Sequence, residues 1–323
     1  ARMSQPPPRA ALLGVLFMIG GVFFGTVLDV AIKFLSSGYA LHQIILIRTI
    51  VAVAILVGVA LRQDGDFRQF RTRRATAHLV RTVIVLVSNF CFFVGLAAMP
   101  LADALAIAFV APMVITAASA LFLNEPVGPH RWGAVIAGLV GVVVMLRPGS
   151  GIIQPAALLI LASAVCYATS QLMSRQMRET ETTVTLNIYL HLGFLIVSVA
   201  MGLIAGDGRF MGAPDGIFAF LFRPWIWPAP LDWPVLIIVG ISVALAGLFA
   251  SQAYRLAEAA LIAPFEYLGM PLAILAGVAI FGDWPDTTAW TGITLICGAG
   301  LYILWREIRH RAVKDPAIPV GDI

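Results

Sequence analysis

The chain has 323 residues, of which 60% are hydrophobic and only 12% are charged, and its mean hydropathy is +0.94. Soluble globular proteins carry about 25% charged residues, so no soluble fold could hide this much apolar surface from water. The composition therefore excludes a soluble enzyme or binding domain and indicates a protein whose solvent is the lipid bilayer.

The apolar residues form long continuous runs rather than the alternating pattern of a membrane β-barrel. A helix needs about 20 apolar residues to cross the hydrocarbon core, and the runs have about this length. The sequence therefore predicts an all-α polytopic membrane protein with ten transmembrane helices. The predicted spans are residues 11–35, 40–61, 78–98, 101–123, 131–147, 154–176, 183–205, 235–256, 259–281 and 287–306.

The basic residues predict an orientation, because cytoplasmic loops are enriched in Lys and Arg. The segment 62–74 contains five arginines, and the segment 306–314 after the last span is also basic. Placing both segments and the N-terminus in the cytoplasm puts 15 of the 21 basic residues there. We therefore expect cytoplasmic N- and C-termini and a long external loop at 206–233.

An internal repeat relates the two halves of the chain. Residues 94–147 align without a gap to residues 253–306, with 11 of 54 positions identical, and Pro112 coincides with Pro271. Each half holds five spans, an odd number, so the second half must lie inverted relative to the first. Inverted repeats are typical of secondary transporters, whose substrate site lies near the midplane between the halves.

The segment PLADALAIAFVAPMVITAASALFLNEPVGPHRWGAVIAGLVGVVVMLRPG (100–149) resembles the first EamA repeat of the drug/metabolite transporter superfamily, and the segment 253–307 resembles the second. The DxxxK of Asp29 and Lys33, the LADA of 101–104 and the motif APFEY extend the resemblance. The chain is similar to the ten-helix permeases grouped with bacterial S-adenosylmethionine and riboflavin uptake transporters. The resemblance implies a carrier of the bacterial inner membrane with a central cavity between two halves. The implied parts are a first five-helix repeat at 1–150, a second, inverted repeat at 151–310 and a cytoplasmic tail at 311–323.

Four ionisable residues near the predicted outer face stand out, because charges inside spans are costly and usually face a cavity or a partner. Asp29 and Lys33 are four residues apart on one helix face, where they either pair with each other or gate the cavity. Arg48 stays charged at any relevant pH, so it needs a carboxylate partner or a substrate group. We expect these three residues to form one charged cluster. Asp103 follows Pro100 at the start of a span, where it either caps free amides or belongs to the gate.

Glu266 lies in the otherwise apolar segment LIAPFEYLGMPLAIL (261–275), about 11 Å into the membrane at 1.5 Å per residue. It either faces the cavity and binds the substrate or is a structural partner of Arg48 or of a polar group on the sixth span. Phe265 and Tyr267 flank it and offer aromatic faces to a cation or a flat ring. Because they lie about 100° to either side of Glu266 on a helix, we expect at most one of them to share its cavity face.

The third, sixth and eighth spans add further candidates for a substrate site. Asn89 and Phe93 share one face of the third span, and Gln252 holds the position of the eighth span that matches Phe93 in the repeat. Tyr167 lies on a polar face of the sixth span, where hydrogen bonding between helices is the alternative role. Aromatic walls with a few amides suit an organic ligand.

These observations predict a secondary transporter that works by alternating access. Its expected substrates are small organic metabolites, cationic or zwitterionic and derived from amino acids or nucleotides. No GxxxxGK[ST] motif is present, so ATP is not the energy source within this chain, and proton or counter-substrate coupling stays open. The alternatives are a channel or a sensor, and least of all an intramembrane enzyme, since HExxH, GxGD and Cys/His clusters are absent. We expect no cofactor and no metal, with the substrate and the bilayer as partners and no nucleic acid.

Overall fold

The fold is seen in a computed structural model that describes residues 8–63, 72, 74–122, 128–146, 155–177, 183–212, 216–256 and 263–314. Within these ranges every regular element is helical, which confirms the predicted all-α class. The elements are α1 (Pro8–Leu35), α2 (Leu41–Gln63), α3 (Ala75–Ala97), α4 (Leu101–Ala108), α5 (Ala111–Phe122), α6 (Pro129–Leu146), α7 (Pro155–Met177), α8 (Thr183–Ala205), α9 (Ala219–Phe222), α10 (Trp233–Leu256), the 3₁₀ helix η2 (Ala263–Leu268), α12 (Gly269–Ala276), the π-helical η3 (Gly277–Phe281) and α13 (Thr287–Lys314).

The predicted spans correspond to apolar helices of two lengths. Among the described residues, 7 helices are long and apolar enough to cross a bilayer. Shorter apolar helices occupy Trp132–Leu146, Phe265–Phe281 and Thr287–Ile303, where the other three spans were predicted. The protein is therefore a multi-pass membrane protein.

Two predicted spans are interrupted rather than continuous. The span predicted at 101–123 divides into α4 and α5, with a turn at Phe109 and Val110. Pro112 explains this break, since it has no N–H to donate to the Ala108 carbonyl and its ring crowds the preceding turn. The span predicted at 259–281 consists of η2, α12 and η3 in succession, and its first four predicted residues lie outside the described ranges.

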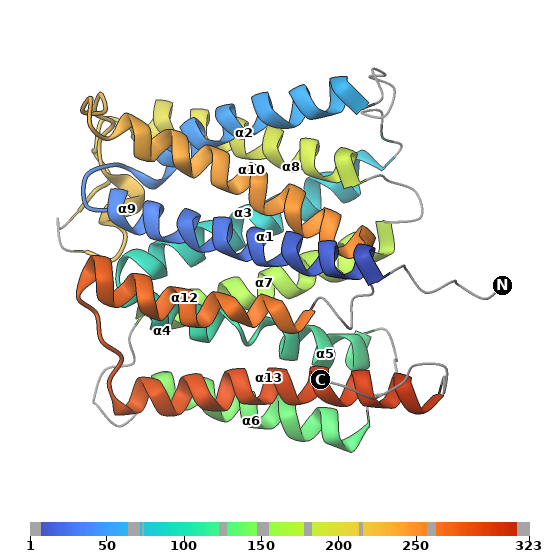
Figure 1. Cartoon of the computed structure of the whole chain (residues 1–323). Coiled ribbons are helices and arrows are strands. Elements are labelled where there is room, and N and C mark those ends of the chain that lie inside the picture. The colour runs from blue at the N-terminus through green and yellow to red at the C-terminus, as the bar shows by residue number, and fades with distance from the viewer. Residues whose placement is uncertain are drawn as a thin grey trace.

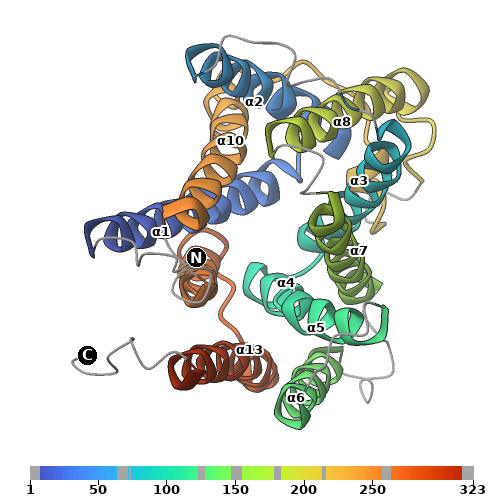
Figure 2. The ribbon, with the colours of Figure 1, turned by 90° about the vertical axis from the view of Figure 1, so that its right-hand side faces the viewer.

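The helices run side by side between two ends of the molecule (Figure 1). The start of α1 and the end of α13 lie at one end, which we call the terminal end, and the connection from α8 to α10 lies at the other, which we call the loop end. Seen along the helices, α1, α10, α2, α8, α3 and α7 follow one another around the bundle, and α6 packs on α13 (Figure 2). The packed pairs that matter most for the site are α1 with α10, α3 with α7, and α1 with η2 and α12.

Small residues bring the packed helices into close contact. A Cβ added at Gly95 of α3 would lie 2.8 Å from the carbonyl oxygen of Ala156 on α7. A Cβ at Gly141 of α6 would lie 3.2 Å from the carbonyl oxygen of Gly292 on α13. Such close backbone approach is the usual way in which membrane helices gain packing energy, because lipid supplies no hydrophobic drive between them.

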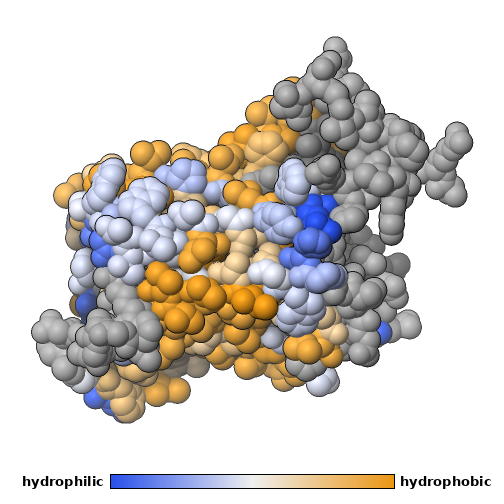
Figure 3. Space-filling view, turned by 90° about the horizontal axis from the view of Figure 1, so that it is seen from below, coloured by the Kyte–Doolittle hydropathy of each residue, from blue (hydrophilic) through white to orange (hydrophobic). Residues whose placement is uncertain are grey.

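The surface matches a protein surrounded by lipid. On the face seen in Figure 3, apolar residues gather in the middle and the most hydrophilic residues lie toward the two ends. Large apolar side chains such as Leu203, Leu121 and Leu275 are exposed, at 80%, 67% and 65%. An apolar belt of this kind would be a liability in water and is the expected surface inside a bilayer.

At the loop end, the connection between α8 and α10 is tied to the turn between α1 and α2. The Tyr39 hydroxyl donates to Asp232 and accepts from the backbone N–H of Ala229 at 3.0 Å. Arg223 donates to the Ser36 carbonyl at 2.5 Å. Burial, followed by the hydrogen bond to Asp232, raises the pKa of Tyr39, so its hydroxyl keeps the proton that it donates at physiological pH.

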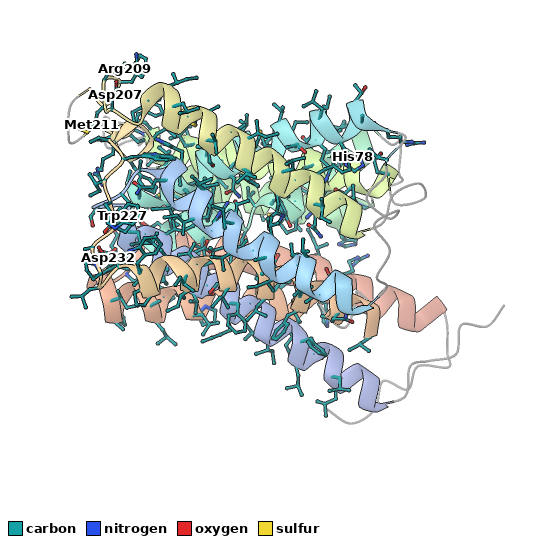
Figure 4. All side chains as sticks on the ribbon, turned by 90° about the horizontal axis from the view of Figure 1, so that it is seen from above. His78, Asp207, Arg209, Met211, Trp227 and Asp232 are labelled. Atoms are coloured by element: carbon teal, nitrogen blue, oxygen red, sulfur yellow. The ribbon has the colours of Figure 1, made fainter. Side chains whose placement is uncertain are left out.

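The labelled side chains in Figure 4 mark the two ends. Asp207, Arg209, Met211, Trp227 and Asp232 lie together at the loop end, and His78 lies at the terminal end on α3. Trp227 is 85% exposed, and aromatic residues of this kind anchor a protein at the membrane surface. This placement agrees with one membrane–water boundary at each end of the bundle.

Candidate functional site

A cavity of about 340 Å³ lies among the middle parts of α1, α3, α4, α5, α7 and the start of η2. This volume falls within the range of about 300–1,000 Å³ that small-molecule sites occupy. The wall combines polar side chains with aromatic rings and small apolar residues. The lining residues are Asp29, Ser88, Asn89, Phe92, Leu105, Ala108, Phe109, Ala111, Pro112, Ser163, Ala164, Tyr167 and Glu266.

Residues of both interrupted spans line the cavity. Phe109 at the break lines it, as does Ala108, whose carbonyl lacks its usual helical donor because Pro112 has none. Glu266 reaches the cavity from η2, whose 3₁₀ winding precedes α12. Non-helical backbone at membrane depth is tolerated where it lines a cavity, and such discontinuous helices often form binding sites in transporters.

Two carboxylates contribute to the cavity wall. Asp29 comes from α1 and Glu266 from η2, and these two elements pack against each other. Asp29 interacts electrostatically with Arg48, whereas Glu266 interacts with Tyr167 and Tyr267. The cavity therefore offers carboxyl groups as hydrogen-bond acceptors on its α1 and η2 side.

Arg48 lies behind the wall rather than in it. Its side chain is only 4% exposed, and its guanidinium lies 5.2 Å from the ring centre of Phe93 and 5.3 Å from that of Phe194. Its Nη2 donates to Asn89 Oδ1 at 2.6 Å. Arg48 thus joins α2 to α3 and α8, and it contacts the cavity through Asp29 and Asn89 rather than directly.

The opposite wall is built where α3 packs on α7. Ser88 donates to the Ser163 carbonyl at 2.9 Å and lies 3.1 Å from the Ser163 hydroxyl, which fixes the two helices in register. One turn further along α7, Gln171 donates to the Tyr167 hydroxyl at 2.5 Å. Tyr167 is 47% exposed although it lies in mid-span, because it faces the cavity.

Several aromatic residues that flank the predicted site lie in different surroundings. Tyr267 stacks on Phe109 with a centroid distance of 5.2 Å, so it supports a lining ring from behind. Phe265 packs against the cluster of Met18 and Ala253. Phe93 is buried below Arg48 and contacts Phe92, which does line the cavity.

Gln252 lies on α10, outside the set of lining residues. Glu266 lines the cavity, and neither Phe265 nor Tyr267 joins it there. Residues 263–268 form a 3₁₀ helix, so successive side chains are about 120° apart rather than the 100° of an α-helix.

Lys33 belongs to a separate group at the loop end. Its Nζ donates to the Met99 carbonyl at 2.5 Å and to the Leu96 carbonyl at 3.2 Å, and it lies 5.2 Å from the Phe281 ring centre. Its electrostatic neighbours are Asp283 and Asp103.

The expected single cluster of Asp29, Lys33 and Arg48 is therefore divided into two groups. Asp29 is linked to Arg48, whereas Lys33 lies one turn further toward the loop end with Asp103 and Asp283. Asp103 lies in the first turn of α4, where the helix dipole favours a carboxylate, and the N-cap residue Pro100 makes no side-chain capping bond.

The sequence-based set thus meets at the cavity only in part. Asp29, Asn89, Tyr167 and Glu266 line it together, although they come from four separate elements. Sequence reasoning missed Phe109, which lines the cavity, and Asp283, which is near Lys33. The helix-breaking Pro112 is a sequence signal for the first, and the turn at Gly282 beside an apolar span is one for the second. Among the described residues, no group of three or more His, Cys, Asp or Glu side chains could hold a metal ion.

Comparison with known proteins assigns the fold to a family. Residues 12–147 match the EamA-like transporter family. The chain is 30% identical to a riboflavin transporter of Rhizobium johnstonii over 311 residues, which cover 96% of this chain and 96% of the relative.

The chain belongs to the EamA-like transporter family.

Other relatives of this EamA-like transporter are named as transporters of riboflavin or of S-adenosylmethionine. It is 28% identical to a riboflavin transporter of Vibrio cholerae, over 95% of this chain and 98% of that one. It is 21% identical to an S-adenosylmethionine uptake transporter of Rickettsia prowazekii, over 95% of this chain and 97% of the relative. The predictions of a small-metabolite transporter of this superfamily, and of a protein that is not an enzyme, are confirmed by the family and by these relatives.

A solved crystal structure shares the fold. It superposes with a TM-score of 0.62 at 18% sequence identity, over 92% of this chain and 98% of the other. At that identity the likeness shows the fold alone. The EamA-like transporter therefore shares its fold with a protein of known structure.

Proposed function

We propose that this EamA-like transporter carries riboflavin or a closely related flat heteroaromatic metabolite across the bacterial inner membrane. The observation that carries the proposal is the cavity, which combines the aromatic rings of Phe92 and Phe109 with polar groups from α1, α3, α7 and η2. Flat rings stack on aromatic side chains, and a polyhydroxylated side chain needs several hydrogen-bonding groups. The two riboflavin transporters that match nearly the whole chain support the same substrate.

S-adenosylmethionine is the second candidate, and a specific feature favours it. The cavity has two carboxylates, Asp29 and Glu266, which come from the packed elements α1 and η2. A cationic or zwitterionic metabolite would gain from the charge of Glu266 in a medium of low dielectric constant. The relatives named as S-adenosylmethionine uptake transporters support this alternative at lower identity.

The transporter works by alternating access between two inverted halves, residues 1–150 and 151–310, with a short tail at 311–323. Pairs of contacts support this division, because α1 packs on α10 as α7 packs on α3, and α10 packs on α2 as α3 packs on α8. The offset of the repeat also relates Phe109 and Val110 at the α4–α5 break to Leu268 and Gly269 at the η2–α12 boundary. Two equivalent interruptions beside one cavity are the expected arrangement of an inverted-repeat transporter.

Lys33, Asp103 and Asp283 form the gate at the loop end, and Asp29 couples this gate to the cavity. The support is the position of Lys33, which connects α1 with the end of α3, the start of α4 and the turn after η3. Opening this end requires the Lys33 contacts to separate. Because Asp29 lies one helical turn from Lys33 on α1, occupancy of the cavity and the state of the gate are mechanically linked.

Uptake assays separate the two substrate classes. The purified protein in liposomes should accumulate labelled riboflavin with saturation, and an excess of unlabelled riboflavin should compete. S-adenosylmethionine at equal excess should not compete. Saturable uptake of S-adenosylmethionine without riboflavin uptake would instead establish the second candidate, and unsaturable flux of either compound would indicate a channel.

Transport is driven by a proton gradient or by exchange with an internal counter-substrate. The same liposomes decide between these two sources of energy. An imposed pH gradient should raise the initial rate if protons are coupled, whereas preloading with unlabelled riboflavin should raise it if exchange is the mechanism.

The loop end faces outward and both chain termini lie in the cytoplasm. The support is the arginine-rich segment 62–74, together with the position of the α1 start and the α13 end at the same end of the bundle. Single cysteines in a variant lacking Cys91, Cys166 and Cys297 test this with an impermeant thiol reagent on intact cells. Label should reach a cysteine at position 227 and not one in the arginine-rich segment, and the opposite pattern would reverse the orientation.

A further inference from the structure

Two cavity-lining side chains receive a hydrogen bond from a neighbour that does not line the cavity. Asn89 on α3 accepts from Arg48, and Tyr167 on α7 accepts from Gln171. In each pair the second residue determines which polar atom of the first is left for a ligand. The direction of these two bonds therefore determines the chemistry of the α3–α7 wall.

The orientation of the Asn89 amide follows from the chemistry of arginine. A guanidinium has donors only, so the atom that faces it must be the amide oxygen, which lies 2.6 Å from Arg48 Nη2. Arg48 itself is held between the rings of Phe93 and Phe194 and is almost fully buried. The Asn89 Nδ2 amino group is left as a donor, and it makes no hydrogen bond with any residue in the described part of the chain.

Tyr167 is arranged in the same way. Its hydroxyl accepts the Nε2–H of Gln171, so its own proton remains to be donated elsewhere. The side chain is 47% exposed at the cavity, where the Glu266 carboxylate is its electrostatic neighbour, so the proton points to the cavity side. The α3–α7 wall thus presents two donors, whereas the carboxylates of Asp29 and Glu266 present acceptors from α1 and η2.

We propose that Arg48 and Gln171 are positioning residues that make Asn89 and Tyr167 hydrogen-bond donors, so that the substrate must present two acceptor atoms to the α3–α7 wall. This inference rests on the proposed function and specifies the substrate class. A fused heteroaromatic ring with carbonyl oxygens at one edge and N–H or hydroxyl donors elsewhere satisfies both sides of the cavity. Arg48 contributes to recognition without contacting the substrate.

The first test changes the polarity of position 89 and keeps its contact with Arg48. In Asn89→Asp the carboxylate still accepts from Arg48, but it has no proton to donate. We expect the KM for riboflavin uptake into liposomes to rise about tenfold, with kcat within about twofold of wild type, because one neutral hydrogen bond is lost. Asn187→Asp on α8, outside the cavity lining, is the matched amide-to-carboxylate control and should leave the KM unchanged.

The second test asks whether Gln171 acts through Tyr167. In Gln171→Glu the carboxylate cannot donate, so the Tyr167 proton turns toward it and the cavity loses a donor although Tyr167 is intact. We expect Gln171→Glu to raise the KM about as much as Tyr167→Phe, and the double variant to be no worse than either single one. Additive effects, or a wild-type KM in Gln171→Glu, would overturn the positioning role.

An analogue of riboflavin in which a pyrimidine carbonyl oxygen is replaced by sulfur tests directly whether the α3–α7 wall donates a hydrogen bond to that atom. Sulfur is the weaker acceptor, so wild type should take up riboflavin about tenfold more efficiently than the analogue. Asn89→Asp should lose this preference while its melting temperature in detergent stays that of wild type, and an unchanged preference would overturn the donor assignment alone. No riboflavin uptake by wild type would overturn the proposed substrate and this inference with it.

Discussion

The loop end and the cavity use polar side chains in opposite ways. At the loop end, Tyr39, Arg223 and Lys33 each reach across to another element and hold it by hydrogen bonds. At the cavity, Asn89 and Tyr167 each accept a hydrogen bond from a residue behind the wall, and we propose that each keeps a donor for the substrate. Buried polar groups are expensive in a bilayer, so the hydrogen bonds that these side chains make across the helices stabilise the fold.

Glu266→Gln should have the largest functional effect, because it removes the charge of a cavity-lining carboxylate and keeps its shape. Hydrogen bonds to charged groups are stronger than neutral ones, so we expect kcat/KM for uptake to fall by at least about tenfold. Liposome uptake measures the loss, and the melting temperature in detergent should stay within about 2 °C of wild type. If the variant transports normally, or only fails to fold, Glu266 has a structural role. The cavity would then use this residue as the loop end uses its polar side chains.

Lys33→Ala should give the largest loss of stability. The lysine satisfies the carbonyls of Leu96 and Met99 with a charged donor, and we expect its removal to cost about 2 kcal/mol. A denaturant titration in mixed micelles measures the change. Lys33→Met keeps the apolar stem and loses the donor, so it should lose nearly as much. Recovery of full stability in Lys33→Met would show that packing, not hydrogen bonding, closes this end.

Tyr39→Phe should cost about 1 kcal/mol, because it breaks the bonds to Asp232 and from Ala229 while keeping the ring in place. Its effect should be confined to stability, since the residue lies at the loop end and away from the cavity. Thermal unfolding in detergent should therefore show a lower melting temperature, whereas the KM for riboflavin uptake should be unchanged. A raised KM would show that the loop end contributes to substrate recognition.

Asp207→Ala should have the smallest effect. Its ion pair with Arg209 is 3.2 Å long and both side chains are more than half exposed, so water screens the interaction. We expect the stability to change by no more than about 0.5 kcal/mol. The same unfolding titration checks this, and a loss comparable to that of Tyr39→Phe would mean that the connection from α8 to α10 is held more tightly than its exposure suggests.

The sequence by itself determined the solvent, the element type and the family. Uninterrupted apolar runs can be read without knowing any long-range contact, because a helix in lipid satisfies its own backbone. A proline also indicates a helix interruption from the sequence alone, and Pro112 breaks its span where α4 ends. Glu266 is a candidate site residue from the sequence alone, since a carboxylate within the apolar segment 261–275 needs either a cavity or a partner.

Only the tertiary structure decided which polar residues share a site. Lys33 and Asp29 occupy one face of α1, yet one turn of helix places them among different neighbours, Asp103 and Asp283 for Lys33 and Arg48 for Asp29. Helix periodicity gives the direction of a side chain but not what lies opposite to it. In the same way, Tyr267 next to Glu266 turns to the back of Phe109.

The role of Arg48 depended on tertiary structure most of all. In the sequence it was an isolated charge that needed an anionic partner or a substrate. Packing of α2 against α8, and a hydrogen bond from Arg48 to α3, place two rings and one amide around it, so its influence on the cavity passes through Asn89. The sequence identifies the polar groups that are costly to bury. Only the packing of helices that are distant in the chain determines which of these groups hydrogen-bond to the protein and which face the cavity.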